Sequence, residues 1–314
     1  MGLAGYVTLG STGERVHLDE REYLEVIEIA RAEVPRGPDR LAFIVGAGQQ
    51  STRGTINEIV KAADAGADAV LVITPHYYRS SITQDALIAH YSSVADAAPV
   101  PVILYSMPAL TGIKIEPETV SRLSRHPNII GVKDSSADIA GFKETIKLVR
   151  ECSTDETRTP TLAREDFAVL TGNGTVLYDA LCAGADGAIL AVGCVAPRLC
   201  IEILDAVKAD EHERAKALQE KLTPLARAVT TTYGIGGLKA ALDLIGYVGG
   251  AVRAPLRAPD EAGRREIARI LAEANAIFAE KESHPGSERN KTTPDTTKST
   301  PEEESSLVPE ASRA

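Results

Sequence analysis

One lysine stands where covalent chemistry is favoured. Lys133 follows the apolar run IIGV at 129–132, so we expect it at the carboxyl end of a buried strand. Burial disfavours the charged form of an amine and lowers its pKa. An amine that is neutral near pH 7 attacks ketones and aldehydes and forms a Schiff base. Position alone also fits a lysine whose ammonium reaches water, so the neighbouring motifs must decide.

Three further motifs follow predicted strands and suit a 2-oxo acid. The glycine-flanked pair Ser11 and Thr12 offers hydroxyls and backbone N–H groups to a carboxylate, or else caps a helix. Tyr105 offers a phenol as acid or base beside a Schiff base, or else is an ordinary rim tyrosine. The segment TGNG at 171–174 leaves room for a ligand. Together with Lys133 these residues suit an enzyme that holds a 2-oxo acid and attacks its ketone.

Alternating β-rich runs and helical patterns must position these residues. The repeat of about 25 to 35 residues is typical of βα units, whose connections require a parallel sheet. We therefore predict a parallel α/β barrel with its chemistry at the carboxyl ends of the strands. The predicted strands are 4–9, 41–46, 68–74, 100–106, 129–133, 167–171 and 187–192. The predicted helices between them are 19–34, 53–66, 83–97, 116–126, 138–151 and 175–184.

The pattern predicts a (β/α)8 TIM barrel that lacks its first βα unit. Seven strands are visible over residues 1–195, and the chain opens almost inside a strand. Either a preceding segment is missing from this sequence, or the sheet has an open seam with unpaired strand edges. We expect a C-terminal helical extension over 196–282, with helices near 196–209, 211–232, 235–245 and 260–281. The polar stretch 283–314 is expected to be disordered.

Composition excludes several classes of partner. The net charge of −10 offers no basic field for nucleic acid. The chain lacks a run of about 18 apolar residues, so no membrane span is expected. The six histidines form no HxxxH or HxH pair, and no metal is expected. The four cysteines form no CxxC pair and are expected to be small buried side chains in a reducing compartment, cytoplasmic or mitochondrial.

Five motifs together resemble the dihydrodipicolinate synthase and N-acetylneuraminate lyase superfamily. They are GSTGE at 10–14, TPHYYR at 74–79, YSMPALTG at 105–112, GVKDSSAD at 131–138 and TGNG at 171–174. The segment 233–256 is similar to the 4-hydroxy-2-oxoglutarate aldolase branch in particular. The resemblance implies a class I aldolase that forms a Schiff base with pyruvate on a (β/α)8 barrel, without a metal or an organic cofactor. It also implies a homo-oligomer, dimer or tetramer.

The resemblance assigns a role to each matching residue. Lys133 would form the Schiff base, Tyr105 would transfer the proton, and Ser11 would take part in the relay. Tyr78 matches the tyrosine that one subunit lends to its neighbour across a dimer interface. The predicted substrate-binding positions are Ser11, Thr12, Ser135, Gly172 and Ile189.

Two departures from the family narrow the predicted substrate. Leu110 stands where dihydrodipicolinate synthases have an arginine that binds the carboxylate of the second substrate. Gly174 and Thr175 stand where neuraminate lyases have an acidic pair. A compact acceptor therefore fits better than an anionic semialdehyde or a sugar tail.

The sequence thus favours cleavage of 4-hydroxy-2-oxoglutarate to pyruvate and glyoxylate. A 2-keto-3-deoxy sugar acid aldolase would share every residue on the pyruvate side. Dihydrodipicolinate synthase activity is disfavoured by Leu110. A non-catalytic truncated paralogue is the third alternative, motivated by the missing βα unit.

Overall fold

The computed structural model describes residues 2–35, 40–153 and 167–274. These residues lie in one compact unit, which spans 1–278, so the predicted boundary at 195 falls inside it. The predicted disordered stretch 283–314 lies outside the described residues.

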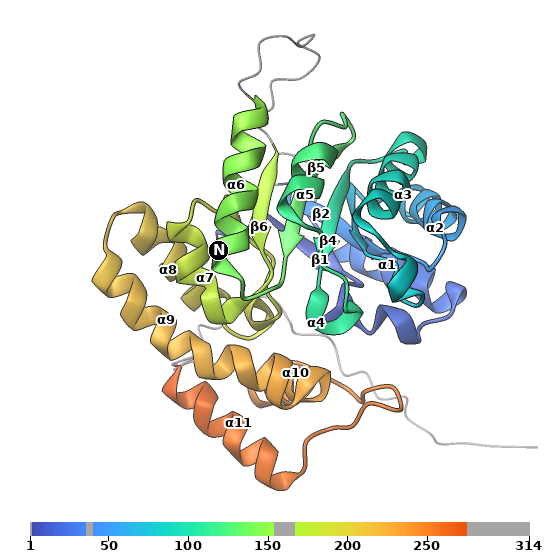
Figure 1. Ribbon diagram of the computed structural model, residues 1–314. Coiled ribbons are helices and arrows are strands. Elements are labelled where there is room, and N and C mark those ends of the chain that lie inside the picture. Colours follow the sequence, from blue (N-terminus) through green and yellow to red (C-terminus); the bar gives the residue numbers. More distant parts are fainter. Residues whose placement is uncertain (1, 36–39, 154–166, 275–314) are drawn as a thin grey trace, which may run out of the picture. The chain divides into compact units, whose positions relative to one another are not determined.

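A curled, wholly parallel sheet of seven strands forms the centre of this unit (Figure 1). The strands lie side by side in chain order, as βα units require. Within the described residues, no strand pairs with the free edge of β1 or of β7. The predicted seven-stranded parallel sheet is confirmed. The strands are β1 Gly5–Thr8, β2 Ala42–Ala47, β3 Ala69–Ile73, β4 Val102–Ser106, β5 Ile129–Asp134, β6 Ala168–Thr171 and β7 Gly187–Ala188.

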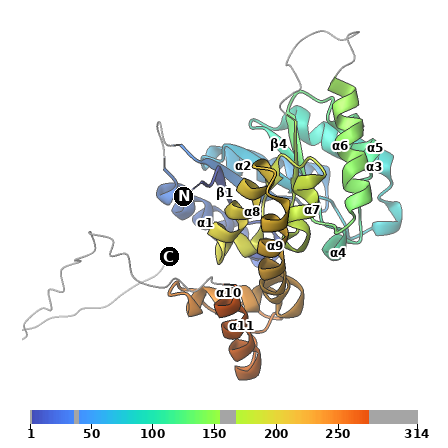
Figure 2. The ribbon, with the colours of Figure 1, turned by 90° about the vertical axis from the view of Figure 1, so that its left-hand side faces the viewer.

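Helices cover the outer face of the sheet (Figures 1 and 2). Their starts are fixed by side chains that accept hydrogen bonds from the first turn, as at Asp19, Ser51 and Thr83. At Asp19 the Glu22 carboxylate also accepts from the cap's own backbone N–H, which completes a capping box. The helices are α1 Glu20–Glu33, α2 Thr52–Asp64, α3 Gln84–Ala97, α4 Pro108–Thr111, α5 Pro117–Leu123, α6 Ile139–Ser153 and α7 Leu177–Cys182.

Side chains point alternately to the two faces of the sheet along each strand, and they form an apolar cluster on each face. Side chains such as Val70, Val102 and Val132 are buried against the helices. Ile103 and Tyr105 belong to a smaller cluster on the opposite, inner face. Because successive side chains point to opposite faces of a strand, this register directs Tyr105 into the barrel.

The amino ends of β3 and β7 are fixed by the same device, which a sequence repeat encodes. The segments AGADAV at 65–70 and AGADGA at 183–188 each end a helix with a glycine at positive φ. The aspartate that follows accepts a backbone N–H from the preceding strand, Phe43 to Asp68 at 2.9 Å and Val169 to Asp186 at 2.7 Å. Each aspartate thereby joins its helix–strand turn to the strand before it.

A C-terminal group of helices packs as a second apolar cluster. Figure 1 shows α10 at the end of the sheet where α4 follows β4, which is the carboxyl end of the strands. Pro224 lies inside α9, and the π-helical turn Ala228–Thr232 follows that helix directly. These helices are α8 Pro197–Lys208, α9 His212–Arg227, α10 Gly234–Leu244 and α11 Glu261–Glu273.

Several sequence-based expectations need correction. Strand β7 is only two residues long, not 187–192, because its second edge has no partner among the described residues and Ala191–Cys194 turn into a 3-10 helix. Helix α4 was not predicted. Cys182 and Cys194 are exposed rather than buried, at the end of α7 and in the 3-10 turn. The predicted helix 260–281 runs to Glu273, and residues from 275 on lie outside the described part.

We expect Asp68→Ala to destabilise the fold by about 2–4 kcal/mol, because it leaves the Phe43 N–H without its acceptor and the buried Arg31 without the carboxylate that balances its charge. Urea unfolding measures the change. The control Asp85→Ala removes a carboxylate that is 93% exposed and should cost less than about 1 kcal/mol. Equal losses in the two variants would contradict the role of Asp68.

Candidate active site

Tyr105 and Lys133 are register partners on the neighbouring strands β4 and β5. Each is the penultimate residue of its strand, so both lie at the carboxyl end of the barrel. Partners in parallel register point to the same face of a sheet. The sheet itself therefore sets the phenol beside the amine.

Lys133 is buried beside an aromatic ring. Its side chain is 8% exposed, and Nζ lies 4.3 Å from the centroid of the Tyr105 ring. Burial lowers the pKa of Lys133 below its ordinary 10.5, while the smaller influence of Tyr105 acts in the opposite direction. The amine therefore loses its proton at a lower pH than an exposed lysine does, which is the condition for nucleophilic attack.

A 3-10 turn after β1 brings Ser11 to the phenol. The turn spans Ser11–Gly13, and Ser11 Oγ lies 2.9 Å from Tyr105 Oη, within hydrogen-bonding distance. Thr12 is half-buried in the same turn. Lys133, Tyr105 and Ser11 therefore form a continuous chain of amine, aromatic ring and two hydroxyls.

Gly172 leaves the space that Lys133 and Ser135 use. A Cβ at Gly172 would lie 1.9 Å from Ser135 Oγ and 2.6 Å from Lys133 Cε, so any larger residue would displace these two side chains. Ser135 Oγ is buried and has no hydrogen-bond partner among the described residues. A buried hydroxyl without a partner is costly.

Ile189 lies one strand further on, at the edge of this group. Its backbone N–H donates to Thr171 O at 2.9 Å, and its side chain is half-buried. The structure therefore brings Lys133, Tyr105, Ser11, Gly172 and Ser135 together and places Ile189 beside them. Their roles in catalysis and binding stay predictions.

Tyr78 lies away from this group. It is 70% exposed, and its ring packs edge-on against Tyr77 with centroids 5.0 Å apart. Within the described residues, no hydrogen bond or ring contact joins Tyr78 to Tyr105 or Lys133. The neighbouring Tyr77 is 74% exposed, so exposure does not distinguish it from the predicted Tyr78. Adjacent tyrosines in one loop give no periodicity that would separate them.

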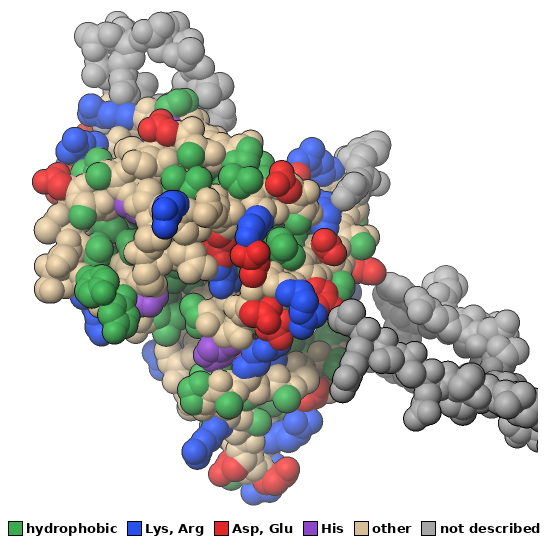
Figure 3. Space-filling view, turned by 90° about the vertical axis from the view of Figure 1, so that its right-hand side faces the viewer, with side chains coloured by type: hydrophobic (Ala, Val, Ile, Leu, Met, Phe, Trp, Pro, Cys, Tyr) green, Lys and Arg blue, Asp and Glu red, His purple; other side chains and the backbone are tan. Residues whose placement is uncertain are grey.

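The described residues contain no cluster of three or more His, Cys, Asp or Glu side chains that could hold a metal ion. None of the described helices is long and apolar enough to cross a membrane. Figure 3 shows acidic and basic side chains intermixed on the face that it draws. The expected compartment stays a prediction.

Comparisons with known proteins agree on one family. A family model described as "Dihydrodipicolinate synthetase family" matches residues 1–274. The chain is 35% identical over 277 residues to a 4-hydroxy-tetrahydrodipicolinate synthase from Jannaschia sp. (strain CCS1), covering 88% of both chains. It is 34% identical over 270 residues to the synthase of that name from Syntrophus aciditrophicus, covering 86% of both chains.

Solved structures give the same result. A monomeric dihydrodipicolinate synthase variant superposes with a TM-score of 0.78 at 30% identity, covering 88% of this chain and 87% of the other. YagE, a prophage protein of that family from E. coli K12 in complex with pyruvate, superposes with a TM-score of 0.76 at 29% identity, covering 88% of both chains.

We expect Lys133→Met to stabilise the fold by about 1–3 kcal/mol near pH 7, because an apolar side chain of similar length replaces a buried amine. The folded-state pKa of Lys133 lies below its ordinary 10.5. At a pH between the folded-state pKa and the ordinary pKa, Lys133 is protonated in the unfolded chain and neutral in the folded chain. The free energy of unfolding of the wild type therefore rises with pH in this range. The variant should lose this rise. Urea unfolding between about pH 6 and pH 10 tests both effects. A variant that is less stable than wild type at every pH would contradict this account.

Proposed function

This chain belongs to the dihydrodipicolinate synthetase family, and on that premise we propose that it cleaves 4-hydroxy-2-oxoglutarate to pyruvate and glyoxylate. It is an enzyme of the pyruvate-dependent, class I aldolase type, a carbon–carbon lyase. The observation that carries the proposal is the buried Lys133 amine beside Tyr105, with Ser11 in contact with the phenol.

In the proposed reaction the neutral amine of Lys133 attacks the C2 ketone and water leaves, which gives a protonated imine. The hydroxyl pair Tyr105 and Ser11, 2.9 Å apart, relays the proton away from the C4 hydroxyl. The C3–C4 bond then breaks, glyoxylate leaves, and the electron pair moves into the imine to give an enamine. Protonation at C3 and hydrolysis release pyruvate and restore Lys133.

The C1 carboxylate is proposed to bind at the Ser11–Gly13 turn. This glycine-flanked turn carries the hydroxyls of Ser11 and Thr12, and Ser11 Oγ lies 2.9 Å from Tyr105 Oη, so a carboxylate bound there would lie beside the phenol. The unpaired hydroxyl of Ser135 is the further donor that we assign to the bound substrate.

A short aldehyde fits best at the end of the site away from the proposed C1 carboxylate position. A Cβ at Gly174 would lie 2.8 Å from Val192 Cγ1 and 3.2 Å from Ala226 Cβ, so the acidic side chain of the sugar-cleaving relatives has no room there. Leu110 is 63% exposed and provides no cation. Both observations support a short aldehyde such as glyoxylate over an amino-acid semialdehyde or a long sugar.

We also propose that the enzyme works as a homo-oligomer, either a dimer or a tetramer. Tyr77, Tyr78 and Leu110 are large exposed hydrophobic side chains on the loops that follow β3 and β4. A second copy of the chain that covers this patch would bring a phenol towards the Tyr105 relay, as predicted for Tyr78.

Lys133→Ala is expected to reduce cleavage of 4-hydroxy-2-oxoglutarate to below about one-thousandth of the wild-type rate, because it removes the amine that forms the imine. Pyruvate release measured with the purified variant tests this expectation. Lys147→Ala, which removes a 59%-exposed lysine on α6, serves as the control and should keep full activity. Retained activity in the Lys133 variant would overturn the mechanism.

Leu110→Arg is expected to speed condensation of pyruvate with aspartate semialdehyde by about 10- to 100-fold, because the new guanidinium supplies a charge-assisted bond to its carboxylate. Rates with the two substrates are compared in wild type, in this variant and in the uncharged control Leu110→Met. The wild type should prefer 4-hydroxy-2-oxoglutarate. Faster turnover of the semialdehyde or of a 2-keto-3-deoxy sugar acid by the wild type would refute the proposed substrate.

A further inference from the structure

The segment that supplies Ser11 is bracketed by two residues in the left-handed region. Leu9 has φ 56° and Glu14 has φ 53°, and neither is glycine. Such conformations cost free energy and persist only where surrounding contacts determine them. The Leu9 end is determined by β2, because a Cβ at Gly46 would lie 2.0 Å from Leu9 O, so the two backbones touch. The Glu14 end needs its own restraint.

Glu14 is held by the C-terminal part of the chain. Its side chain is 8% exposed, and Oε2 lies 2.6 Å from Lys239 Nζ on α10. Oε1 accepts the backbone N–H of Arg253 at 2.7 Å. Lys239 Nζ also donates to Ala251 O at 2.6 Å, so one ammonium joins the turn, α10 and the loop after α10.

The charge on Glu14 is maintained by these two partners. Burial alone would raise the pKa of Glu14, yet the Arg253 N–H and the Lys239 ammonium outweigh it and lower the pKa below its ordinary 4.5. A buried carboxylate that loses its cation is strongly destabilised in place. Without Lys239 the Glu14 side chain would therefore tend to leave its site and change the backbone that follows Ser11.

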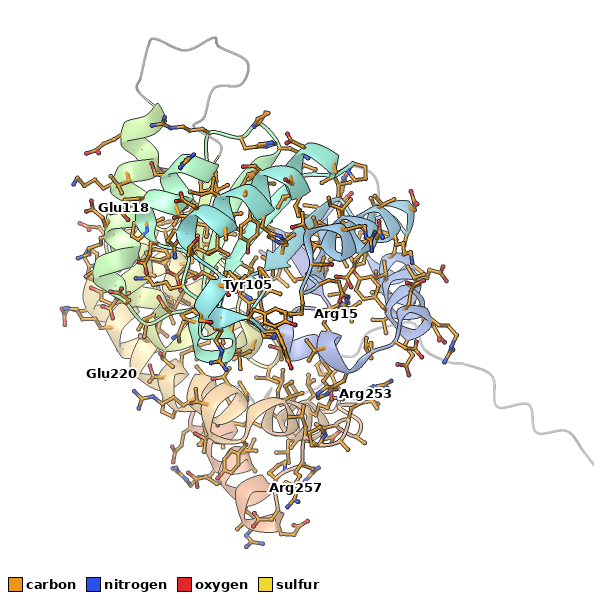
Figure 4. All side chains as sticks on the ribbon, turned by 45° about the vertical axis from the view of Figure 1, so that its right-hand side comes forward. Arg15, Tyr105, Glu118, Glu220, Arg253 and Arg257 are labelled. Atoms are coloured by element: carbon orange, nitrogen blue, oxygen red, sulfur yellow. The ribbon has the colours of Figure 1, made fainter. Side chains whose placement is uncertain are left out.

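Neighbouring contacts fix the frame around this pair. The guanidinium of Arg253 binds both carboxylate oxygens of Glu22 in α1, at 2.8 and 3.2 Å. On the other side of the turn, Arg15 pairs with Glu58 of α2. Figure 4 shows Tyr105 and Arg15 at the end of the barrel that faces the C-terminal helices, and Arg253 below Arg15 at the level of these helices. Within the described residues, Lys239 is the side-chain cation bonded to Glu14.

We propose that Lys239 is a positioning residue for catalysis: through its ion pair with Glu14, α10 holds the 3-10 turn so that Ser11 meets Tyr105. Lys239 touches neither of these two hydroxyl groups and acts through the turn. As far as it concerns catalysis, the inference rests on the proposed function, since it concerns the carboxylate-binding and proton-relay turn of that reaction.

The test compares Lys239→Met, the conservative Lys239→Arg and the control Lys216→Met. Lys216 is another ion-paired lysine of the C-terminal helices, 50% exposed, and it binds Glu213 instead of the turn. Lys239→Met should raise KM for 4-hydroxy-2-oxoglutarate and lower kcat/KM by about 10- to 100-fold, more than it lowers kcat. Lys239→Arg should recover most of the loss, and Lys216→Met should match wild type.

Hydrogen exchange gives a second readout that needs no activity. The amides of Gly13 and Glu14 donate to Gly10 O and Ser11 O within the turn. They should exchange faster in Lys239→Met and at the wild-type rate in Lys216→Met. Unchanged exchange, or a lower melting temperature with unchanged KM, would overturn the positioning role. If the wild type has no lyase activity, the proposed function fails, and the exchange result still decides whether Lys239 holds the turn.

Discussion

Burial of one amine is the constraint on which the site depends. Lys133 ends a strand whose other residues are apolar, and its surroundings remove the water that would stabilise an ammonium. That burial costs folding free energy and lowers the pKa of the amine. In the proposed reaction, the neutral form of this lysine is the nucleophile. Gly172 and Ser135 then provide space and a hydroxyl donor next to it.

The sheet and the C-terminal helices position different residues of the candidate site. Parallel register alone sets Tyr105 beside Lys133, because the two residues pair on adjacent strands. Ser11 lies in a turn of unfavourable backbone geometry, which contacts Gly46 of β2 at one end and Lys239 of α10, through Glu14, at the other. We propose that a third group of residues determines substrate choice. Leu110 and Gly174 differ from their counterparts in the synthases and the sugar-cleaving enzymes, whereas the pyruvate side keeps the family pattern.

Sequence patterns predicted the strands and the inner residues well, because apolar runs and βα spacing are local signals. Strand β7 was predicted too long, since a run of apolar residues does not reveal that its second neighbour is missing. The link from Glu14 to Arg253 spans 239 positions and follows no period, so no local pattern could predict it. Tyr77 and Tyr78 are both exposed, and choosing between them needs the geometry of an assembly.

The most direct test of the central claim is intact-mass spectrometry after incubation with pyruvate and borohydride, followed by peptide mapping. Borohydride reduces a Schiff base to a stable amine. We expect one pyruvate adduct per chain, located on Lys133. A folded protein that gains no adduct, or that gains one on another lysine, would contradict the account.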